Sequence, residues 1–317
     1  MNALRTSAFF IACGLIGNAQ AAMLPDGLTL IPGAYPPGQQ PDGNSLLIRT
    51  DDGLLLFDTG RHASHTQAVI DAAKTQQLPI VAVVNSHWHL DHVGGNPRIR
   101  AAFPKVKVYA SAAIVAAQQG FLAGYRTQLV DAIADSKNPA QIQSWRDEIA
   151  LIDAGPALRP DVTVAGPLTL NLGGRRLELH LQAKAATAGD VWLYDPKSAT
   201  LVAGDLVTLP VPFLDTACPQ GWNDALQALS DTPFKQLVPG HGPLLDTAQF
   251  QRYRSAYTGL LACAASQAEV SACARDWTQA LDGLISDAEK PRVLPMLDYY
   301  FKTRLRAEPA PECLLRS

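Results

Sequence analysis

Three histidines and an aspartate lie within six residues, in the run His87-Trp88-His89-Leu90-Asp91-His92. This run follows residues 80–84, five consecutive apolar residues that predict a β-strand buried on both faces. Burying so many imidazole and carboxylate groups is costly unless they bind something. Imidazole nitrogen and carboxylate oxygen are ligands of zinc and similar ions, at ~2.0–2.2 Å. The sequence therefore predicts a metal site at the end of this strand.

The spacing within the run divides its ligands between two positions. His87 and His89 are two residues apart, so an extended backbone projects both side chains to the same side. Asp91 and His92 follow where the chain turns toward Val93-Gly94-Gly95-Asn96, and they can reach a second ion. The alternative, a surface loop of histidines without a metal, leaves this density of ligand types unexplained.

Composition excludes several classes of protein. The chain has 317 residues, of which 47% are hydrophobic and 17% charged, whereas disordered chains combine low hydrophobicity with high charge. Its formal net charge of −3 provides no basic field to attract nucleic acid or an anionic membrane. We therefore expect a small-molecule substrate and no nucleic-acid partner. The sequence does not indicate an oligomeric state.

Residues 1–21 have the build of a secretory signal peptide. Arg5 precedes an apolar run over residues 8–16, and Ala19-Gln20-Ala21 matches the small-residue rule for cleavage. The run is too short to span a bilayer, which takes ~20 apolar residues, so no stable membrane insertion is expected. The alternative is a buried N-terminal helix. We expect an exported protein that is periplasmic or secreted.

Export changes the interpretation of the cysteines. Four of them, Cys218, Cys263, Cys273 and Cys313, lie beyond the signal segment, and in an oxidising compartment they allow three pairings. Cys263 and Cys273 are the nearest pair in sequence, so we favour a disulfide there, which leaves Cys218 to pair with Cys313. Thiolate metal ligands are disfavoured because the chain has no C-x-x-C pair.

The remaining chain, residues 22–317, is predicted to form one α/β domain because strands and helices alternate in both of its halves. Residues 111–150 are expected to form a helical insert, which either covers the site or only packs, and residues from about 248 a helical C-terminal extension. Strands are expected at 45–50, 54–57, 80–84, 162–165, 168–172, 177–182, 191–194, 200–203 and 236–238, and helices at 66–77 and 224–229.

Several motifs, in order along residues 27–246, resemble those of the metallo-β-lactamase superfamily. The H-x-H-x-D-H run resembles its metal motif. Asn44-Ser45 with Phe57-Asp58-Thr59-Gly60 resembles its opening hairpin and D-T-G loop. Ala203-Gly204-Asp205-Leu206-Val207 resembles the later G-D element, and Pro239-Gly240-His241-Gly242 the P-G-H-G turn.

The resemblance implies an α/β fold, the αβ/βα four-layer sandwich of two mixed β-sheets with helices on the outer faces. It implies hydrolysis by metal-bound hydroxide, with zinc as cofactor and an ester, thioester, lactone or lactam as substrate; a β-lactamase is the specific version. Asp91 becomes the candidate catalytic residue, and Asp58 is expected to orient ligands. The implied metal ligands are His87, His89, Asp91, His92, Asp205 and His241.

One ligand of the superfamily pattern is missing. A further histidine belongs before Thr187, Gly189 and Asp190, and this chain has Ala186 there. The first metal position then keeps only His87 and His89 with a bridging Asp205. We therefore expect one zinc ion at the second position, with a second ion bound weakly.

Two other interpretations of Ala186 stay open. His62 or Lys184 compensates for the missing imidazole; His180 lies about 20 Å away along an extended strand and is excluded. Otherwise the protein is a degenerate, metal-binding accessory protein without turnover. The metal content of the purified protein tests these interpretations, because metal-free protein with an intact fold would favour the one without turnover.

Overall fold

The computed structural model describes residues 21–35 and 39–314. The predicted signal peptide lies outside the described residues except for Ala21. The strands are β1 (Ala22–Leu24), β2 (Leu28–Ile31), β3 (Ser45–Thr50), β4 (Gly53–Phe57), β5 (Ile80–Val84), β6 (Lys107–Ala110), β7 (Val162–Thr163), β8 (Leu168–Leu172), β9 (Arg175–Gln182), β10 (Asp190–Asp195), β11 (Thr200–Thr208), β12 (Gln236–His241) and β13 (Leu245–Asp246). The helices are α1 (Ala63–Thr75), α2 (Leu90–Val93), α3 (Asn96–Ala102), α4 (Ala113–Gln119), α5 (Phe121–Asp135), α6 (Pro139–Asp153), α7 (Pro219–Ser230), α8 (Thr247–Ala265), α9 (Val270–Ala280), α10 (Lys290–Tyr300) and α11 (Pro311–Leu314).

The strands form two mixed sheets. The first runs in chain order from β1 to β7, with antiparallel neighbours up to β4 and parallel neighbours from β4 onward. The second has the order β13-β12-β11-β10-β9-β8, in which only β11 and β12 are parallel.

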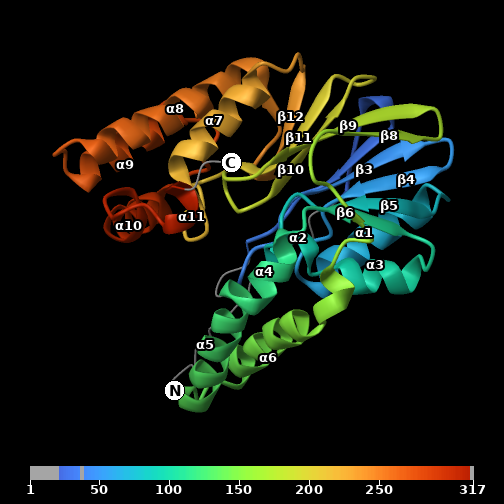
Figure 1. The fold of residues 1–317 in the computed structure, drawn as a ribbon, viewed down its shortest axis with the longest axis horizontal. Helices are drawn as coiled ribbons and strands as arrows, with labels where there is room; N and C mark the ends of the chain where they lie inside the picture. Colours follow the sequence, from blue (N-terminus) through green and yellow to red (C-terminus); the bar gives the residue numbers. More distant parts are fainter. Residues whose placement is uncertain (1–20, 36–38, 315–317) are drawn as a thin grey trace, which may run out of the picture.

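Side-chain alternation along β4 explains the layers. Leu55 and Phe57 lie in the core between the two sheets, whereas Leu54 and Leu56 pack with α1 and α3 on the outer face. A strand covered on both faces has to be apolar throughout, as β4 and β5 are. On the other side, α7 and α8 cover the second sheet (Figure 1). The predicted four-layer architecture is confirmed.

The predicted helical insert is a bundle of α4, α5 and α6, in which α5 and α6 form a hairpin that projects from the sandwich (Figure 1). Its core includes Trp88, Leu122 and Leu129. The insert therefore packs against the H-x-H-x-D-H run itself and stands next to the predicted metal site.

The C-terminal extension packs α8, α9 and α10 on the outer side of the second sheet. Two disulfides cross-link the extension, and both predicted pairings are confirmed. Cys263–Cys273 joins α8 to α9, with 5.8 Å between Cα atoms. Cys218–Cys313 joins the loop before α7 to α11, with 5.4 Å between Cα atoms. Among the described residues, no helix is both long and apolar enough to cross a membrane.

Candidate metal centre and active-site pocket

The predicted ligands come from strands of both sheets and from the segment that follows β5. His87 and His89 follow β5, and the short helix α2 carries Asp91 and His92. Asp205 lies within β11, and His241 ends the parallel neighbour β12, where it pairs with Thr208. The two sheets thus deliver their polar residues to one edge of the sandwich.

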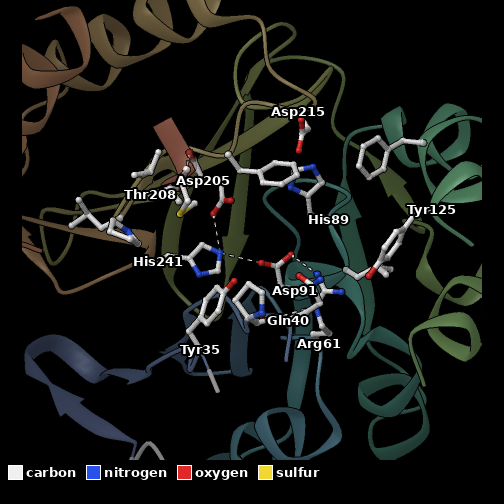
Figure 2. Close-up of a pocket in the computed structure, with 18 of the residues that line it drawn as sticks. Tyr35, Gln40, Arg61, His89, Asp91, Tyr125, Asp205, Thr208, Asp215 and His241 are labelled. Atoms are coloured by element: carbon white, nitrogen blue, oxygen red, sulfur yellow. Dashed lines mark hydrogen bonds and ion pairs between the residues drawn. The ribbon is translucent and has the colours of Figure 1, made fainter. Parts of the chain in front are cut away.

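Four of these side chains converge on one point. His92 Nε2 lies 3.2 Å from Asp205 Oδ1 and 3.6 Å from Asp91 Oδ2. His241 Nε2 lies 3.0 Å from Asp91 Oδ2 and 3.6 Å from Asp205 Oδ1 (Figure 2). Each nitrogen is thus close enough to both oxygens to share an ion bound at ~2.0–2.2 Å. The four atoms are hereafter called the Asp91 cluster; Asp91, His92 and His241 form one group that could hold a metal ion, and Asp205 forms a second group with His87 and His92.

Two atoms of the Asp91 cluster are otherwise unpartnered. Within the described residues, His92 Nε2 and Asp205 Oδ1 are buried and make no hydrogen bond. Native proteins rarely bury polar atoms in this way unless water or an ion satisfies them. The donor set, two imidazoles and two carboxylates, suits zinc. The residues therefore fit the metal that the sequence predicted.

Asp58 holds His92 from behind. Its Oδ2 lies 2.8 Å from His92 Nδ1, and its two oxygens accept hydrogen bonds from the backbone N and the Oγ of Ser86, both at 2.7 Å. A carboxylate behind a ligating histidine fixes the ring and its tautomer. Asp58 thus has the orienting contact expected from the sequence.

The glycines of the two later motifs allow the close approach of these strands. A Cβ on Gly240 would lie 1.9 Å from Asp205 Oδ1, and one on Gly204 would lie 2.4 Å from Ser86 Cβ. Gly204 also has φ +53°, which glycine adopts without strain. Only glycine at these positions leaves room for the ligands.

The charges in the Asp91 cluster support one another. Although burial favours its neutral form, positive charge on His92 and His241 lowers the pKa of Asp205 to about 2. Burial alone would lower the pKa of His92, but Asp205, Asp58 and Asp91 raise it well above its ordinary value. The pKa of His241 is raised as well, against the effect of burial, by Asp205 and Asp91.

We expect the zinc affinity of the metal-free protein to rise with pH. Zinc binds neutral imidazole, so it must displace the protons that the raised pKa values keep on His92 and His241. The gain should continue above ~6.5, the ordinary pKa of histidine. Competition with a chromophoric chelator at about pH 6, 7 and 8 measures it. An affinity that does not change over this range would contradict the protonation of the cluster.

The remaining predicted pair, His87 and His89, forms a different structure. Ser86 Oγ lies 2.9 Å from His87 Nδ1, and it has donated its one hydrogen to the Asp58 carboxylate. His87 Nδ1 therefore donates to Ser86, and the lone pair of His87 Nε2 faces His89 Nδ1 at 2.8 Å. Burial lowers the pKa of both rings, that of His89 to about 3, so both are neutral.

Thr216 lies where this pair meets Ala186. Its Oγ1 is 3.0 Å from His89 Nε2 and 3.1 Å from the carbonyl oxygen of Ala186. If the hydroxyl donates to His89, then His89 donates to His87 and the two rings share an ordinary hydrogen bond. If it donates to Ala186, then His89 Nε2 donates to the hydroxyl, and the lone pairs of His89 Nδ1 and His87 Nε2 face each other. This arrangement needs a cation between the two nitrogens. His87 groups with His92 and Asp205, and not with His89, as residues that could hold a metal ion, and its Nε2 lies 3.8 Å from Asp205 Oδ2.

The residues proposed to compensate for Ala186 lie elsewhere. His62 Nδ1 is 2.8 Å from Asp42 Oδ2 at the start of α1. His180, which distance along the strand had already excluded, stacks on Trp192 with 3.9 Å between ring centroids. Lys184 is half-buried and does not line the pocket at the site. The compensation interpretation therefore finds no support in the positions of these side chains.

A family model described as the metallo-beta-lactamase superfamily matches residues 39–242, more than half of the chain. The chain belongs to the metallo-β-lactamase superfamily. This region contains all six predicted ligands and ends just after the histidine turn. Members of the superfamily are mostly hydrolases and generally bind zinc.

Curated relatives and solved structures agree with this membership. A hydroxyacylglutathione hydrolase from Nostoc sp. is 38% identical over 89 residues, which are 23% of this chain and 35% of that protein. An (R)-specific secondary-alkylsulfatase from Pseudomonas sp. is 28% identical over 180 residues, 51% of this chain and 27% of that protein. The chain thus spans about a third or less of the length of these relatives.

The solved structures establish the fold alone. A metallo-β-lactamase from Pontibacter korlensis has a TM-score of 0.56 and 24% identity, covering 75% of this chain and 98% of that one. A double mutant of the sec-alkyl sulfatase PisA1 has a TM-score of 0.60 and 21% identity, covering 92% of this chain and 52% of that one.

A buried ion pair that the sequence motifs did not predict lies beside the Asp91 cluster. Arg61, directly after the D-T-G loop, pairs through Nη1 with Glu148 of the insert helix α6. Its Nη2 lies 3.4 Å from Asp91 Oδ1, on the side of that carboxylate away from the cluster contact. Arg61 and Glu148 are buried. Asp91 is therefore held from behind by an ion pair that the insert completes.

We expect Arg61→Gln and Glu148→Gln each to weaken zinc binding by about tenfold, the lower range for contacts behind a metal ligand. Without Arg61, Asp91 loses the partner that aims Oδ2 at the cluster. The control is Arg126→Gln, which breaks an exposed ion pair between α5 and α6 with Asp153. Zinc titration of purified protein measures the effect. Equal losses of zinc affinity in all three variants would mean that the changes only weaken the packing of the insert, and they would contradict the role of the Arg61–Glu148 pair.

A pocket of ≈460 Å³ opens over the Asp91 cluster (Figure 2). Asp91, Asp205 and His241 line its floor together with His89. Its walls come from the insert helix α5, the loop 209–218, the helix α10 and the segment around Tyr35. Sequence patterns did not reveal this pocket, because its lining residues come from distant segments of the chain.

Proposed function

We propose that this protein hydrolyses an ester-type bond in a small molecule, with one zinc ion held by Asp91, His92, Asp205 and His241. The observation that carries the proposal is the convergence of two imidazole nitrogens and two carboxylate oxygens at the floor of a pocket: each nitrogen lies 3.0–3.6 Å from both oxygens, and two of the four atoms are buried and unpartnered. A zinc ion held there would lower the pKa of water toward neutrality and polarise the bond to be cleaved.

The chain's own residues supply position and charge. Two carboxylates, Asp91 and Asp205, offset the charge of the ion, and Asp58 fixes the ring of His92. His89 lines the pocket as a neutral ring, and its two nitrogens face His87 and Thr216. Aromatic and aliphatic side chains make up most of the lining of the pocket.

Ester, thioester, lactone and lactam are the substrate classes of this proposal. The names of the relatives favour an ester or thioester, because they include alkylsulfatases, hydroxyacylglutathione hydrolases and an atrochrysone carboxyl ACP thioesterase. β-Lactam hydrolysis is the narrower version and rests on the shared fold.

The test compares zinc-loaded and chelated protein on an aryl ester, a thioester, a lactone and a β-lactam. Turnover that chelation removes and zinc restores would support the proposal. One bound equivalent of zinc without turnover on any of these compounds would overturn it in favour of a metal-binding protein without catalysis.

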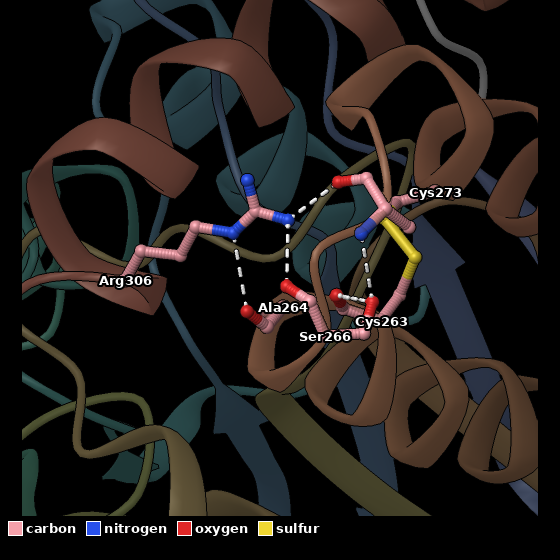
Figure 3. The surroundings of a disulfide bond; sticks show 6 residues. Cys263, Ala264, Ser266, Cys273 and Arg306 are labelled. Atoms are coloured by element: carbon pink, nitrogen blue, oxygen red, sulfur yellow. Dashed lines mark hydrogen bonds between the residues drawn. A yellow bond between two sulfur atoms is a disulfide. The ribbon is translucent and has the colours of Figure 1, made fainter.

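We also propose that the protein is exported to the periplasm or beyond. The predicted signal peptide supports this, as do two disulfides, which persist in oxidising compartments. Figure 3 shows that Arg306 donates to the carbonyl oxygens of Ala264 and Ser266, so the Cys263–Cys273 link lies in an ordered corner of the extension.

Both disulfides are expected in protein recovered from the periplasm. The double variant Cys263→Ser/Cys273→Ser should lose about 3 kcal/mol in the free energy of unfolding, and Cys218→Ser/Cys313→Ser nearly 5, because it opens a longer loop. Urea unfolding measures both losses. Mass mapping that finds all four cysteines as free thiols would contradict the pairing and remove this support for export.

A further inference from the structure

Aromatic rings form a continuous arc along the pocket. Ring centroids lie 5.4 Å apart between Phe121 and Trp88, and 4.5 Å apart between Trp88 and His89. The arc continues from His89 to Phe213 at 5.1 Å and from Phe213 to Tyr300 at 6.3 Å. It therefore leads from the insert helix α5, past the metal ligands, to α10.

The far end of this arc lies outside the part of the chain that the superfamily model matches. Tyr300 and Met296 belong to α10, which begins 48 residues after residue 242. Cys263–Cys273 lies within this extension, and Cys218–Cys313 links its end to the loop before α7. This wall is thus a feature of this chain, and it faces the same pocket as the Asp91 cluster.

The pocket also has a cation without an anionic partner. Arg292 of α10 lines it with its guanidinium 3.6 Å from the ring centroid of Tyr35. In the described part of the chain, Arg292 has no ion pair. The acid that lines the same wall, Asp215, is engaged by the hydroxyl of Tyr299 at 3.0 Å and by Arg304 at 3.6 Å.

We propose that the substrate carries a large apolar, aromatic body that packs on this arc and an anionic group that Arg292 binds. A cavity of ≈460 Å³ is in the range that buries such a molecule, and aromatic walls bind flat rings by stacking and edge contacts. The position of the scissile bond over the cluster rests on the proposed hydrolase function; the binding of the aromatic body and of the anion does not.

The test is equilibrium binding to the zinc-loaded full chain, by calorimetry, of two probes without an ester bond: 3-(2-naphthyl)propionate and its neutral amide. Phe213→Ala should weaken both probes about tenfold, because it removes a stacking wall. Phe121→Ala, at a position that is 43% exposed and so unimportant for folding, should weaken both as well. The matched controls Val130→Ala on α5 and Leu294→Ala on α10 change exposed apolar side chains outside the pocket and should have no effect.

The charge is tested separately. The unaltered protein should bind the carboxylate about tenfold more tightly than the amide, and Arg292→Gln should remove this preference while Arg292→Lys keeps part of it. A preference that survives Arg292→Gln would mean that the carboxylate binds the zinc, and it would overturn the role of Arg292. Equal affinities in the lining variants and their controls would overturn the aromatic site.

The two proposals fail in different ways. Probe binding that depends on Phe213 and Arg292, without turnover of any ester, would overturn the hydrolase function and leave the binding site standing. Turnover of a small ester such as phenyl acetate, in a protein that binds neither probe, would overturn the binding site and leave the hydrolase function standing.

Discussion

Replacement of Asp91 by alanine is expected to reduce bound zinc to a small fraction of an equivalent and to abolish hydrolysis. Asp91 Oδ2 is within 3.6 Å of both ring nitrogens of the cluster. Its loss removes a ligand and one of the two negative charges that offset the ion, and it leaves Arg61 facing the site with its charge less compensated. We expect zinc affinity to fall by at least about 100-fold, beyond the range seen for supporting residues.

Elemental analysis after dialysis and titration with a chromophoric chelator measure this loss. The matched control is Asp215→Ala, which removes a carboxylate from the same pocket but not from the cluster. It should keep its zinc. If Asp91→Ala retains full zinc occupancy and activity, the assignment of the ligands from the H-x-H-x-D-H motif is wrong.

The fold could be predicted because its signals are local. The all-apolar strands β4 and β5 have to be covered on both faces, and this requirement already implies a layered α/β arrangement. Five of the six strands of the second sheet were expected from short alternating or apolar segments, and β8 agrees in both bounds, whereas β13 was not expected. What alternation cannot give is the order of strands within a sheet; the arrangement in two sheets came from the resemblance.

Among the differences between expected and observed strands, one strand that is longer than expected and one that was not expected have clear physical reasons. The strand expected at 200–203 continues to Thr208, because Gly204 takes a positive φ at an irregular point of the β11–β12 register and does not end the strand. Asp205 therefore projects from within a strand. Lys107–Ala110 was not predicted as a strand, since four residues that begin with an exposed lysine show little alternation.

The residues of the candidate site likewise divide into those that a local motif predicts and those that it does not. His92, Asp205 and His241 could be named from the sequence because each belongs to a motif with its own local backbone. Glu148 could not be, since it lies on a polar insert helix, 87 residues from Arg61, and nothing nearby marks it as buried. Thr216 is equally hidden, because a threonine in a loop gains its meaning only from the Ala186 carbonyl and the His89 ring beside it.

The protein is expected to bind one equivalent of zinc tightly and a second at least tenfold more weakly, a gap of ~1.4 kcal/mol. The cluster of Asp91, His92, Asp205 and His241 offers four ligands, whereas the other position offers His87 together with His92 and Asp205, both of which it would share with the cluster. Stable zinc sites hold three or four protein ligands, and sharing Asp205 between two ions weakens its bond to each. Zinc titration of chelated protein measures the stoichiometry.

Restoring the missing imidazole should restore the second tight equivalent. Ala186 is buried and Thr216 lies against its carbonyl, so a histidine there needs space that the threonine occupies. The variant is therefore Ala186→His/Thr216→Gly, with Thr216→Gly alone as the control that should stay at one equivalent. The double variant frees His89 Nε2 from Thr216 and places a third nitrogen beside the His87–His89 pair. Two tight equivalents in the unaltered protein would mean that a group already closes this site, and Thr216 would then be the first residue to replace.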